Sequence, residues 1–275
     1  MKKSLISLAV LGALGSSMVS YAQEATPAAK EEKPSYTLAY NVGLFSQYIW
    51  RGLTQTDNKP ALQGGVDFTH DSGFYLGAWG SNISWLTDSI GETGSGDKYY
   101  SSGGSLEVDL YGGYRTEIAK TGIGLDVGVL QYWYPGKVSA GMAKANATEL
   151  YGALSYKWLQ GKYSGLVSSD GWGFGDTRGA SYMELNLTVP VGDLIDNSYM
   201  KGVSVIAHAG RVNLKCTGCD IYNYTDYKLG ASKAFDSGLT VGAYWTDTNN
   251  KSENWQMDGQ NIGRSLGTVF VQKTF

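Results

Sequence analysis

The sequence predicts an all-β protein, a closed antiparallel transmembrane β-barrel of about twelve strands, and three observations support this. After residue 34 the chain divides into segments of about ten residues in which apolar and polar side chains alternate. The connections between these segments are alternately long and short, as in outer-membrane barrels with extended outer loops and tight periplasmic turns. No apolar run after residue 22 approaches the roughly 20 residues of a spanning helix, so a membrane-spanning chain would have to use strands.

The first 34 residues precede this pattern and are expected to lie outside the barrel. Residues 1–22 have the features of a cleaved signal peptide, with the basic Lys2 and Lys3, a short apolar core and small residues before the expected cleavage site. Residues 23–34, rich in Ala, Glu, Lys and Pro, are predicted to be a disordered lead-in. The outer-membrane β-barrel is then predicted over residues 35–275, in a protein exported through the periplasm.

Twelve segments come close to the length of a tilted spanning strand, which is about 9–11 residues. They are 35–46, 61–70, 73–82, 104–115, 122–134, 147–158, 161–169, 180–190, 202–212, 224–235, 238–247 and 264–275. The odd-numbered connections are long, and the even-numbered ones are short except for 191–201. One predicted tight turn is 159–160. An even number of strands places both ends of the barrel domain on the periplasmic side.

Alternation within each segment separates a lipid face from a lumen face. In segment 104–115, Leu106 and Leu110 alternate with Glu107 and Asp109. Charged side chains are costly against lipid, so the charged set is expected to face the lumen. The predicted pore-lining acids are Asp67, Glu107, Asp109, Asp126, Glu149, Glu184 and Asp226, and the predicted pore-lining bases are Arg115, Lys157, Lys162 and Lys228. Such a mildly acidic interior predicts a weak preference for cations.

The composition argues against a nucleic-acid partner and is compatible with a barrel. Without Lys2 and Lys3 of the signal peptide, 20 of the 22 basic residues remain against 25 acidic residues, a net charge of about −5. Binding to nucleic acid requires a basic face. The chain has 38 Gly, 20 Tyr and 8 Trp but only 2 His. Many strands with aromatic belts and small interior residues would produce this mixture.

The last predicted strand, 264–275, ends in the aromatic Phe275. A terminal aromatic residue on an amphipathic strand resembles the C-terminal signature of Gram-negative outer-membrane barrels, which the barrel assembly machinery recognises. The expected partners are therefore that machinery, through Phe275, together with outer-membrane lipid and lipopolysaccharide. Lys273 departs from the pattern, but a lysine near the membrane interface can extend its amine to water.

Residues 46–65 carry a more specific resemblance. They contain Ser-Gln-Tyr-Ile-Trp-Arg-Gly, then Gln-Thr and Pro-Ala-Leu-Gln-Gly, and segment 73–82 follows with Gly-Phe-Tyr-Leu-Gly-Ala-Trp-Gly-Ser-Asn. These segments resemble the opening hairpin of the TorF-type porin family, also called Gcw_chp. The resemblance implies an outer-membrane channel. Because that family has no established catalytic residues, it implies none in this chain.

Tyr48, Trp50 and Arg51 lie where the first predicted strand meets the first external loop, and two interpretations stay open. In one, Arg51 is a pore-lining constriction or a ligand contact. In the other, Arg51 forms a structural ion pair with a carboxylate of the wall, and Tyr48 and Trp50 are aromatic residues of the interfacial belt. The Gly-aromatic segment 170–176 likewise either stacks on a sugar or is a flexible outer loop.

Cys216 and Cys219 are the only cysteines, and we expect them to form a small loop disulfide because an exported protein meets an oxidising compartment. A redox or metal role is the alternative, but no His or third Cys lies nearby in the sequence. His70 and His208 are not accompanied by a visible nucleophile. No catalytic residue, metal site or cofactor is therefore predicted.

Together these observations predict a porin-like outer-membrane channel for passive diffusion of small hydrophilic solutes, rather than an enzyme. A non-conducting structural or surface-binding barrel is the main alternative, and an outer-membrane enzyme is the third. Conductance of the refolded protein in a planar bilayer would discriminate the channel from the structural barrel.

Overall fold

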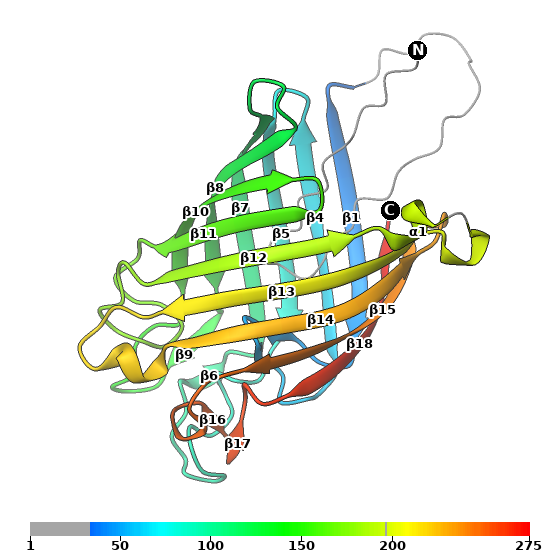
Figure 1. The fold of residues 1–275 in the computed structure, drawn as a ribbon. Coiled ribbons are helices and arrows are strands. Elements are labelled where there is room, and N and C mark those ends of the chain that lie inside the picture. Colours follow the sequence, from blue (N-terminus) through cyan, green and yellow to red (C-terminus); the bar gives the residue numbers. More distant parts are fainter. Residues whose placement is uncertain (1–33, 196) are drawn as a thin grey trace, which may run out of the picture.

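The computed structural model describes residues 34–275 apart from residue 196, so the predicted signal peptide 1–22 and lead-in residues 23–33 lie outside the described residues. Twelve antiparallel strands form a closed barrel (Figure 1). They are β1 Tyr36–Phe45, β4 Ala61–His70, β5 Phe74–Asn82, β7 Leu106–Glu117, β8 Ile123–Trp133, β10 Ala147–Tyr156, β11 Leu159–Leu166, β12 Ser181–Val189, β13 Val203–Asn213, β14 Tyr224–Ala234, β15 Leu239–Thr248 and β18 Leu266–Thr274. The predicted closed barrel of twelve antiparallel strands is confirmed.

β1 closes the barrel by pairing with β4 on one side and with β18 on the other. It pairs with β4 over its whole length, from Tyr36 opposite His70 to Phe45 opposite Ala61. Its ladder with β18 covers only Asn41 to Phe45. The two neighbours of β1 are therefore staggered along it, as expected when tilted strands close into a barrel.

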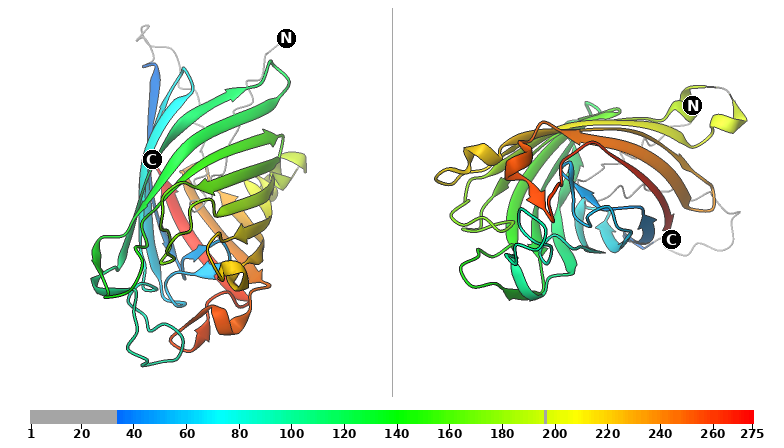
Figure 2. Two further views of the ribbon diagram at one scale, coloured as in Figure 1. Left: turned by 90° about the vertical axis from the view of Figure 1, so that its left-hand side faces the viewer. Right: turned by 90° about the horizontal axis from the view of Figure 1, so that it is seen from below.

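The long and short connections lie at opposite ends of the barrel, as the alternation predicts (Figures 1 and 2). The six long connections are loop 1 (46–60), loop 2 (83–105), loop 3 (134–146), loop 4 (167–180), loop 5 (214–223) and loop 6 (249–265). They contain β2 Ile49–Trp50, β3 Leu53–Thr54, β6 Tyr100–Gly103, β9 Gly136–Val138, η2 Cys219–Tyr222, η3 Ser252–Asn254, β16 Gln256–Met257 and β17 Gln260–Asn261.

At the short-turn end, only the β12–β13 connection is extended. It contains α1 (Val191–Leu194) and η1 (Ser198–Met200), which project from the barrel in Figure 1. This is the connection 191–201 that the sequence singles out as long. No helix in the described part of the chain is long and apolar enough to cross a membrane.

The turn between β10 and β11 differs from the prediction. It consists of Lys157 and Trp158, and Leu159 already pairs with Tyr156 across the hairpin. Lys157 has φ of +53° and is exposed in the turn, so its predicted place on the lumen wall is wrong. The turn lies two residues earlier than predicted, and a shift of two residues leaves every later side chain of the strand on its predicted face.

The outside of the barrel is apolar, and β1 illustrates the pattern. Tyr36, Leu38, Tyr40, Val42 and Leu44 alternate along this strand and are 44–53% exposed. Of the residues between them, Ala39 and Asn41 are half-buried and Gly43 is buried, whereas Thr37 at the end of the strand is exposed. An exposed apolar surface that continues around a barrel is expected to be covered by lipid, and the polar interior accounts for the other half of the alternation.

Cysteine labelling in whole cells tests this orientation. Leu110 and Val127 are 52% and 42% exposed on the outer face, so single cysteines there should be protected by lipid from a membrane-impermeant maleimide. A cysteine at Ser95, exposed in loop 2, should react strongly. All three should react after denaturation, which serves as the control. Strong labelling at Val127 in intact cells would contradict the assignment of the faces.

Candidate functional site

Loop 1 forms a short hairpin that folds into the barrel. β2 pairs with β3, and the two residues between them, Arg51 and Gly52, both have positive φ, +46° and +78°. Two-residue hairpins of type I′ require this conformation at both positions, which glycine adopts without strain. A Cβ on Gly52 would lie 2.6 Å from the Cβ of Asp226 on β14. The tip of the hairpin therefore packs directly against the wall.

Arg51, at the tip, makes a buried ion pair with the wall. Its Nη2 donates to both carboxylate oxygens of Glu149 on β10, at 2.7 and 2.9 Å. The two side chains are 3% and 1% exposed. The guanidinium also lies 4.2–5.1 Å from the ring centroids of Trp50, Trp172 and Tyr182. The charge is thus both paired and enclosed by aromatic faces, which a buried guanidinium needs to offset its lost hydration.

Two further contacts extend the hairpin across the interior. Tyr48, 4% exposed, donates from its hydroxyl to Glu107 on β7 at 2.7 Å. Trp50 packs edge-on against Tyr132 of β8, with ring centroids 5.9 Å apart. Tyr48 and Trp50 are therefore interior residues, and the interpretation of them as belt aromatics is wrong. The hairpin reaches β7, β8, β10, β12 and β14, so it crosses the lumen (Figure 2).

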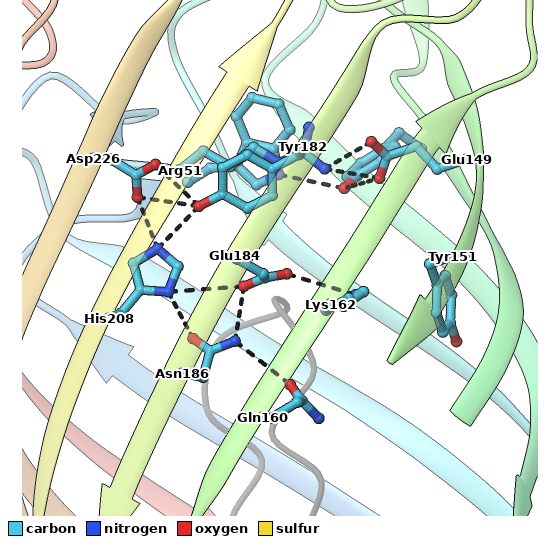
Figure 3. A network of polar contacts seen from close by, with 12 residues as sticks. Arg51, Glu149, Tyr151, Gln160, Lys162, Tyr182, Glu184, Asn186, His208 and Asp226 are labelled. Atoms are coloured by element: carbon cyan, nitrogen blue, oxygen red, sulfur yellow. Dashed lines mark hydrogen bonds and ion pairs between the residues drawn. The ribbon is translucent and has the colours of Figure 1, made fainter. Parts of the chain in front are cut away.

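Below the hairpin, a polar network runs across β11, β12, β13 and β14 (Figure 3). The Tyr182 hydroxyl donates to both carboxylate oxygens of Asp226, at 3.1 and 3.0 Å, and lies 2.9 Å from Nε2 of His208. The other ring nitrogen of His208 contacts the amide oxygen of Asn186 at 2.6 Å. Asn186 donates to Glu184 at 3.0 Å. The registers explain the network, because Asn186 lies opposite His208.

Glycine at position 210 permits this arrangement. Gly210 faces Glu184 on one side and Asp226 on the other. The ring of Tyr182 lies across it so closely that a Cβ there would collide with the phenol oxygen and Cζ. Without a side chain at this point, the tyrosine can lie flat on the wall and reach Asp226 two strands away.

A second set of charged residues lies nearer the short-turn end. Nε of Arg115 donates to Asp126 at 3.1 Å, and these two residues face each other across β7 and β8. Tyr75 donates to the other oxygen of Asp126 at 2.6 Å. Tyr111 donates to Asp67 at 2.5 Å. The Arg115–Asp126 pair joins the neighbouring strands β7 and β8, whereas the two tyrosines reach across one strand, from β5 to β8 and from β7 to β4.

Ten of the predicted pore-lining residues on the strands lie on the inner face: all seven acids, together with Arg115, Lys162 and Lys228. Lys157 lies in a turn instead. Lys162 lies opposite Glu184, with 4.0 Å between the amine and a carboxylate oxygen. Lys228 lies opposite His208, with its amine 5.0 Å from the Tyr244 ring centroid. Figure 3 shows that Arg51, Lys162, Glu184 and Asp226 converge on one side of the interior.

Two acids near the long-loop end lack a basic partner. Asp109 is fully buried, and neither of its carboxylate oxygens has a hydrogen-bond partner among the described residues. Glu107, two residues earlier on the same face, accepts a hydrogen bond from the Tyr48 hydroxyl and forms no ion pair with a base among the described residues. Within residues 34–275 as described, no group of three or more His, Cys, Asp or Glu side chains is placed to hold a metal ion.

The sequence pattern placed Glu184 on the inner face but did not indicate its partner Asn186 or the part that His208 plays, because His208 was considered only as a catalytic group. The pattern also did not indicate Trp172 and Tyr182 as partners of Arg51. The available signal was Arg51-Gly52 itself, since glycine beside a polar residue, between short segments of strand-forming residues, is typical of a two-residue hairpin turn. That signal predicts a hairpin but not the direction in which it folds.

Cys216 and Cys219 form a disulfide in loop 5, with 5.2 Å between their Cα atoms. A disulfide restricts the unfolded chain according to the logarithm of the closed loop, so this short loop should add at most about 1–2 kcal/mol. We expect intact-mass analysis of the envelope protein to show no free thiol. We expect the double variant Cys216→Ser/Cys219→Ser to fold, with its free energy of unfolding lowered by no more than that amount. Two free thiols, or loss of folding in the variant, would contradict this.

Above the hairpin, the six long loops surround a cavity of about 110 Å³. Every loop contributes at least one aromatic side chain to its lining, namely Trp50, Trp85, Tyr134, Trp172, Tyr222 and Trp255 in order of loops 1 to 6. Trp172 and Phe174 of segment 170–176 both take part, so this segment folds onto the barrel mouth. Arg51 also lines the cavity. We call this space the outer cavity.

The apolar exterior, the charged interior and the inserted hairpin define a membrane-spanning β-barrel of the porin type, with a loop across its lumen. The chain belongs to the family described as "Bacterial protein of unknown function (Gcw_chp)", which matches residues 29–275. The resemblance seen in residues 46–82 is thereby confirmed.

Among solved structures, the chain is similar to the KdgM porin, with a TM-score of 0.50, 9% identity, and coverage of 86% of this chain and 99% of that one. It is also similar to the NanC porin, with a TM-score of 0.48, 11% identity, and coverage of 87% and 99%. At such identities the likeness concerns the fold. The comparison with curated proteins found no match.

Proposed function

We propose that this protein is an outer-membrane channel for the passive diffusion of small hydrophilic solutes, with a constriction formed by the loop 1 hairpin. The observation that carries the proposal is the charged inner wall beneath an apolar exterior. Asp109, Glu149, Glu184 and Asp226 are all at most 7% exposed inside the barrel. A barrel that served only as a structural element would be more stable with an apolar core, because burying carboxylates costs free energy that their partners only partly offset.

Passage of ions should depend on the acids that have no basic partner. Arg51, Arg115 and Lys162 are each paired with a carboxylate, which reduces their influence on a passing ion. Glu107 and Asp109 have no such partner among the described residues. They lie near the long-loop end, where a solute from outside would arrive. We therefore propose a weak preference for cations, weak because salt screens charges beyond about 10 Å at 0.1 M.

Single-channel recording of the refolded protein in a planar bilayer tests the proposal. The double variant Glu107→Gln/Asp109→Asn should shift the reversal potential in a salt gradient toward anions, with little change in conductance, because the side chains keep their size. As a matched control, Asp71→Asn/Glu117→Gln also removes two charges, both exposed near the short turns, and should shift it less. An equal shift in both variants would exclude the unpaired acids as the selectivity element.

A non-conducting structural or surface-binding barrel is the second candidate, and the inserted hairpin is the observation that favours it. If the hairpin closes the lumen completely, the refolded protein will show no conductance steps. The same recording therefore separates the two candidates.

The enzyme alternative rests on less. Contrary to the expectation from the sequence, His70 does have a hydroxyl beside it, since its Nδ1 lies 2.7 Å from Oγ of Ser72, but this pair lies in an exposed turn and no carboxylate among the described residues contacts the other ring nitrogen. His208 contacts Tyr182, Asn186 and Asp226, and no Ser, Thr or Cys of the described residues contacts its ring.

A further inference from the structure

The outer cavity has a lining of unusual chemistry for the mouth of a polar channel. Nine of its lining residues are aromatic, from Trp50 of loop 1 to Trp255 of loop 6. Aliphatic residues such as Leu53 and Met257 fill much of the rest. Arg51 is the only charged residue in the lining, and there is no carboxylate. Burial among these rings raises the pKa of Tyr99 to about 12, so its phenol also stays neutral.

Hydrogen-bond donors without partners are concentrated around this cavity. Nε1 of Trp85, Trp172 and Trp255, and Nε of Arg51, are buried and have no hydrogen-bond partner among the described residues. All four side chains line the cavity. A buried donor without an acceptor costs about 1–3 kcal/mol. Four such donors around one space are costly to the empty protein, and a ligand that supplies acceptors would recover part of that cost.

The donors and the charge restrict the chemistry of the ligand. A quaternary ammonium ion suits an aromatic box, but Arg51 and the unpartnered N–H groups disfavour a cation. A sugar needs acceptors for its hydroxyl groups; the lining offers the amide oxygens of Gln55, Asn254 and Gln256 but no carboxylate, the acceptor that sugar sites usually use, and a neutral sugar would leave the charge of Arg51 unused. A carboxylate accepts from several donors and pairs well with a guanidinium. The unused Nε of Arg51 remains available for such an anion while Nη2 is held by Glu149.

The size and the walls of the cavity restrict the rest of the ligand. An apolar cavity of about 150 Å³ holds benzene, so a volume of about 110 Å³ excludes guests with more than one ring, and the loops must move apart slightly even for a single ring. The ring centroids of Trp50 and Trp172 lie 5.4 Å apart with an angle of 49° between the ring planes. Those of Tyr224 and Trp255 lie 5.2 Å apart with an angle of 79°. Rings at such angles offer both faces and edges to an aromatic guest.

We propose that the outer cavity binds a single-ring aromatic carboxylate, with its ring among Trp85, Trp172 and Trp255 and its carboxylate at Nε of Arg51. This deepens the proposed function, on which it rests, by naming a class of solute that Arg51 would hold at the outer mouth. The weak cation preference is a separate property of the inner wall, where Glu107 and Asp109 act on small ions in passage. The ion pair with Glu149 sets the strength of binding. Glu149 neutralises much of the charge of Arg51, so the anion is held loosely enough to leave again.

Binding to the full chain in lipid nanodiscs tests this, with benzoate as the probe. We expect saturable binding by isothermal titration calorimetry. Acetate, which lacks the ring, and benzyl alcohol, which lacks the carboxylate, should each bind at least about tenfold more weakly, the factor that 1.4 kcal/mol represents. Tighter binding of glucose or of tetramethylammonium than of benzoate would overturn the assignment of the ligand class.

Three variants locate the site. Trp172→Phe keeps a ring but removes one N–H, and should weaken benzoate binding about five- to tenfold, the usual effect of one hydrogen bond. Glu149→Gln keeps the side-chain volume but leaves the charge of Arg51 uncompensated, and should strengthen benzoate binding about tenfold. Trp158→Phe, in the turn at the opposite end of the barrel, is the matched control and should leave the affinity unchanged.

The gain in Glu149→Gln distinguishes this site from damage to the fold, because a misfolded barrel would not bind more tightly. Benzoate binding that none of the cavity variants alters would overturn the inference. Conductance without benzoate binding would overturn the inference and leave the channel proposal standing. Benzoate binding without conductance would leave the site standing and reject the channel.

Discussion

Deletion of the hairpin Ile49–Thr54 should raise the single-channel conductance severalfold. This segment carries Trp50 and Arg51 across the interior, where they reach β8, β10 and β12. Without it, the lumen at that level would be bounded only by the side chains of the wall, and a wider water-filled path passes more ions. Recording of the refolded variant in a planar bilayer would measure the change.

The control for this experiment is a deletion that shortens a loop without touching the lumen. Gly94–Gly96 of loop 2 are exposed, and a Cβ at either glycine would meet nothing within 4 Å. Their removal should leave the conductance unchanged. If the hairpin deletion conducts no better than this control, the hairpin is not the constriction of the channel.

Glu149→Ala should lower the free energy of unfolding by about 3–5 kcal/mol, because it leaves the buried guanidinium of Arg51 without its partner. The double variant Arg51→Met/Glu149→Leu should recover most of that loss, since both charges are then removed and apolar side chains replace them among Trp50, Trp172 and Tyr182. Urea unfolding in lipid vesicles of the wild-type protein, the single variants Arg51→Met and Glu149→Leu and the double variant would complete the double-mutant cycle.

The exposed acid Glu92 of loop 2 provides the control for this cycle. Glu92→Ala should change the free energy of unfolding by no more than about 0.5 kcal/mol. Additive effects of the Arg51 and Glu149 substitutions would show that the ion pair does not couple the hairpin to the wall. The hairpin would then be held in the lumen by aromatic packing alone.

Much of the barrel could be predicted because the residues of each spanning strand show by themselves which side chains face lipid and which face the lumen. Side chains alternate between lipid and lumen with a period of two, so Leu106, Glu107, Val108 and Asp109 show their faces without any knowledge of their neighbours. The number of strands and the two ends follow from the lengths of the connections. The Lys157 error was also local, since a turn two residues earlier preserves the same alternation.

The contacts of the interior were beyond such reasoning, because they depend on register and on closure. Tyr182, His208 and Asp226 come from three strands and meet only because Gly210 leaves room for the ring of the tyrosine. Sequence patterns assign each residue to the inner face but do not say which residues will be level with one another along the barrel.

The sequence by itself determined the fold class, the two faces of the wall and the family of this protein. These depend on periodicity and on segments read one at a time. Only the tertiary structure decided that loop 1 turns inward, that Arg51 pairs with Glu149, and that six loops enclose one aromatic cavity. A hairpin of the same local sequence could equally point into water. It folds inward because a carboxylate and three aromatic rings, from segments up to 131 residues away in the sequence, compensate the burial of its charge.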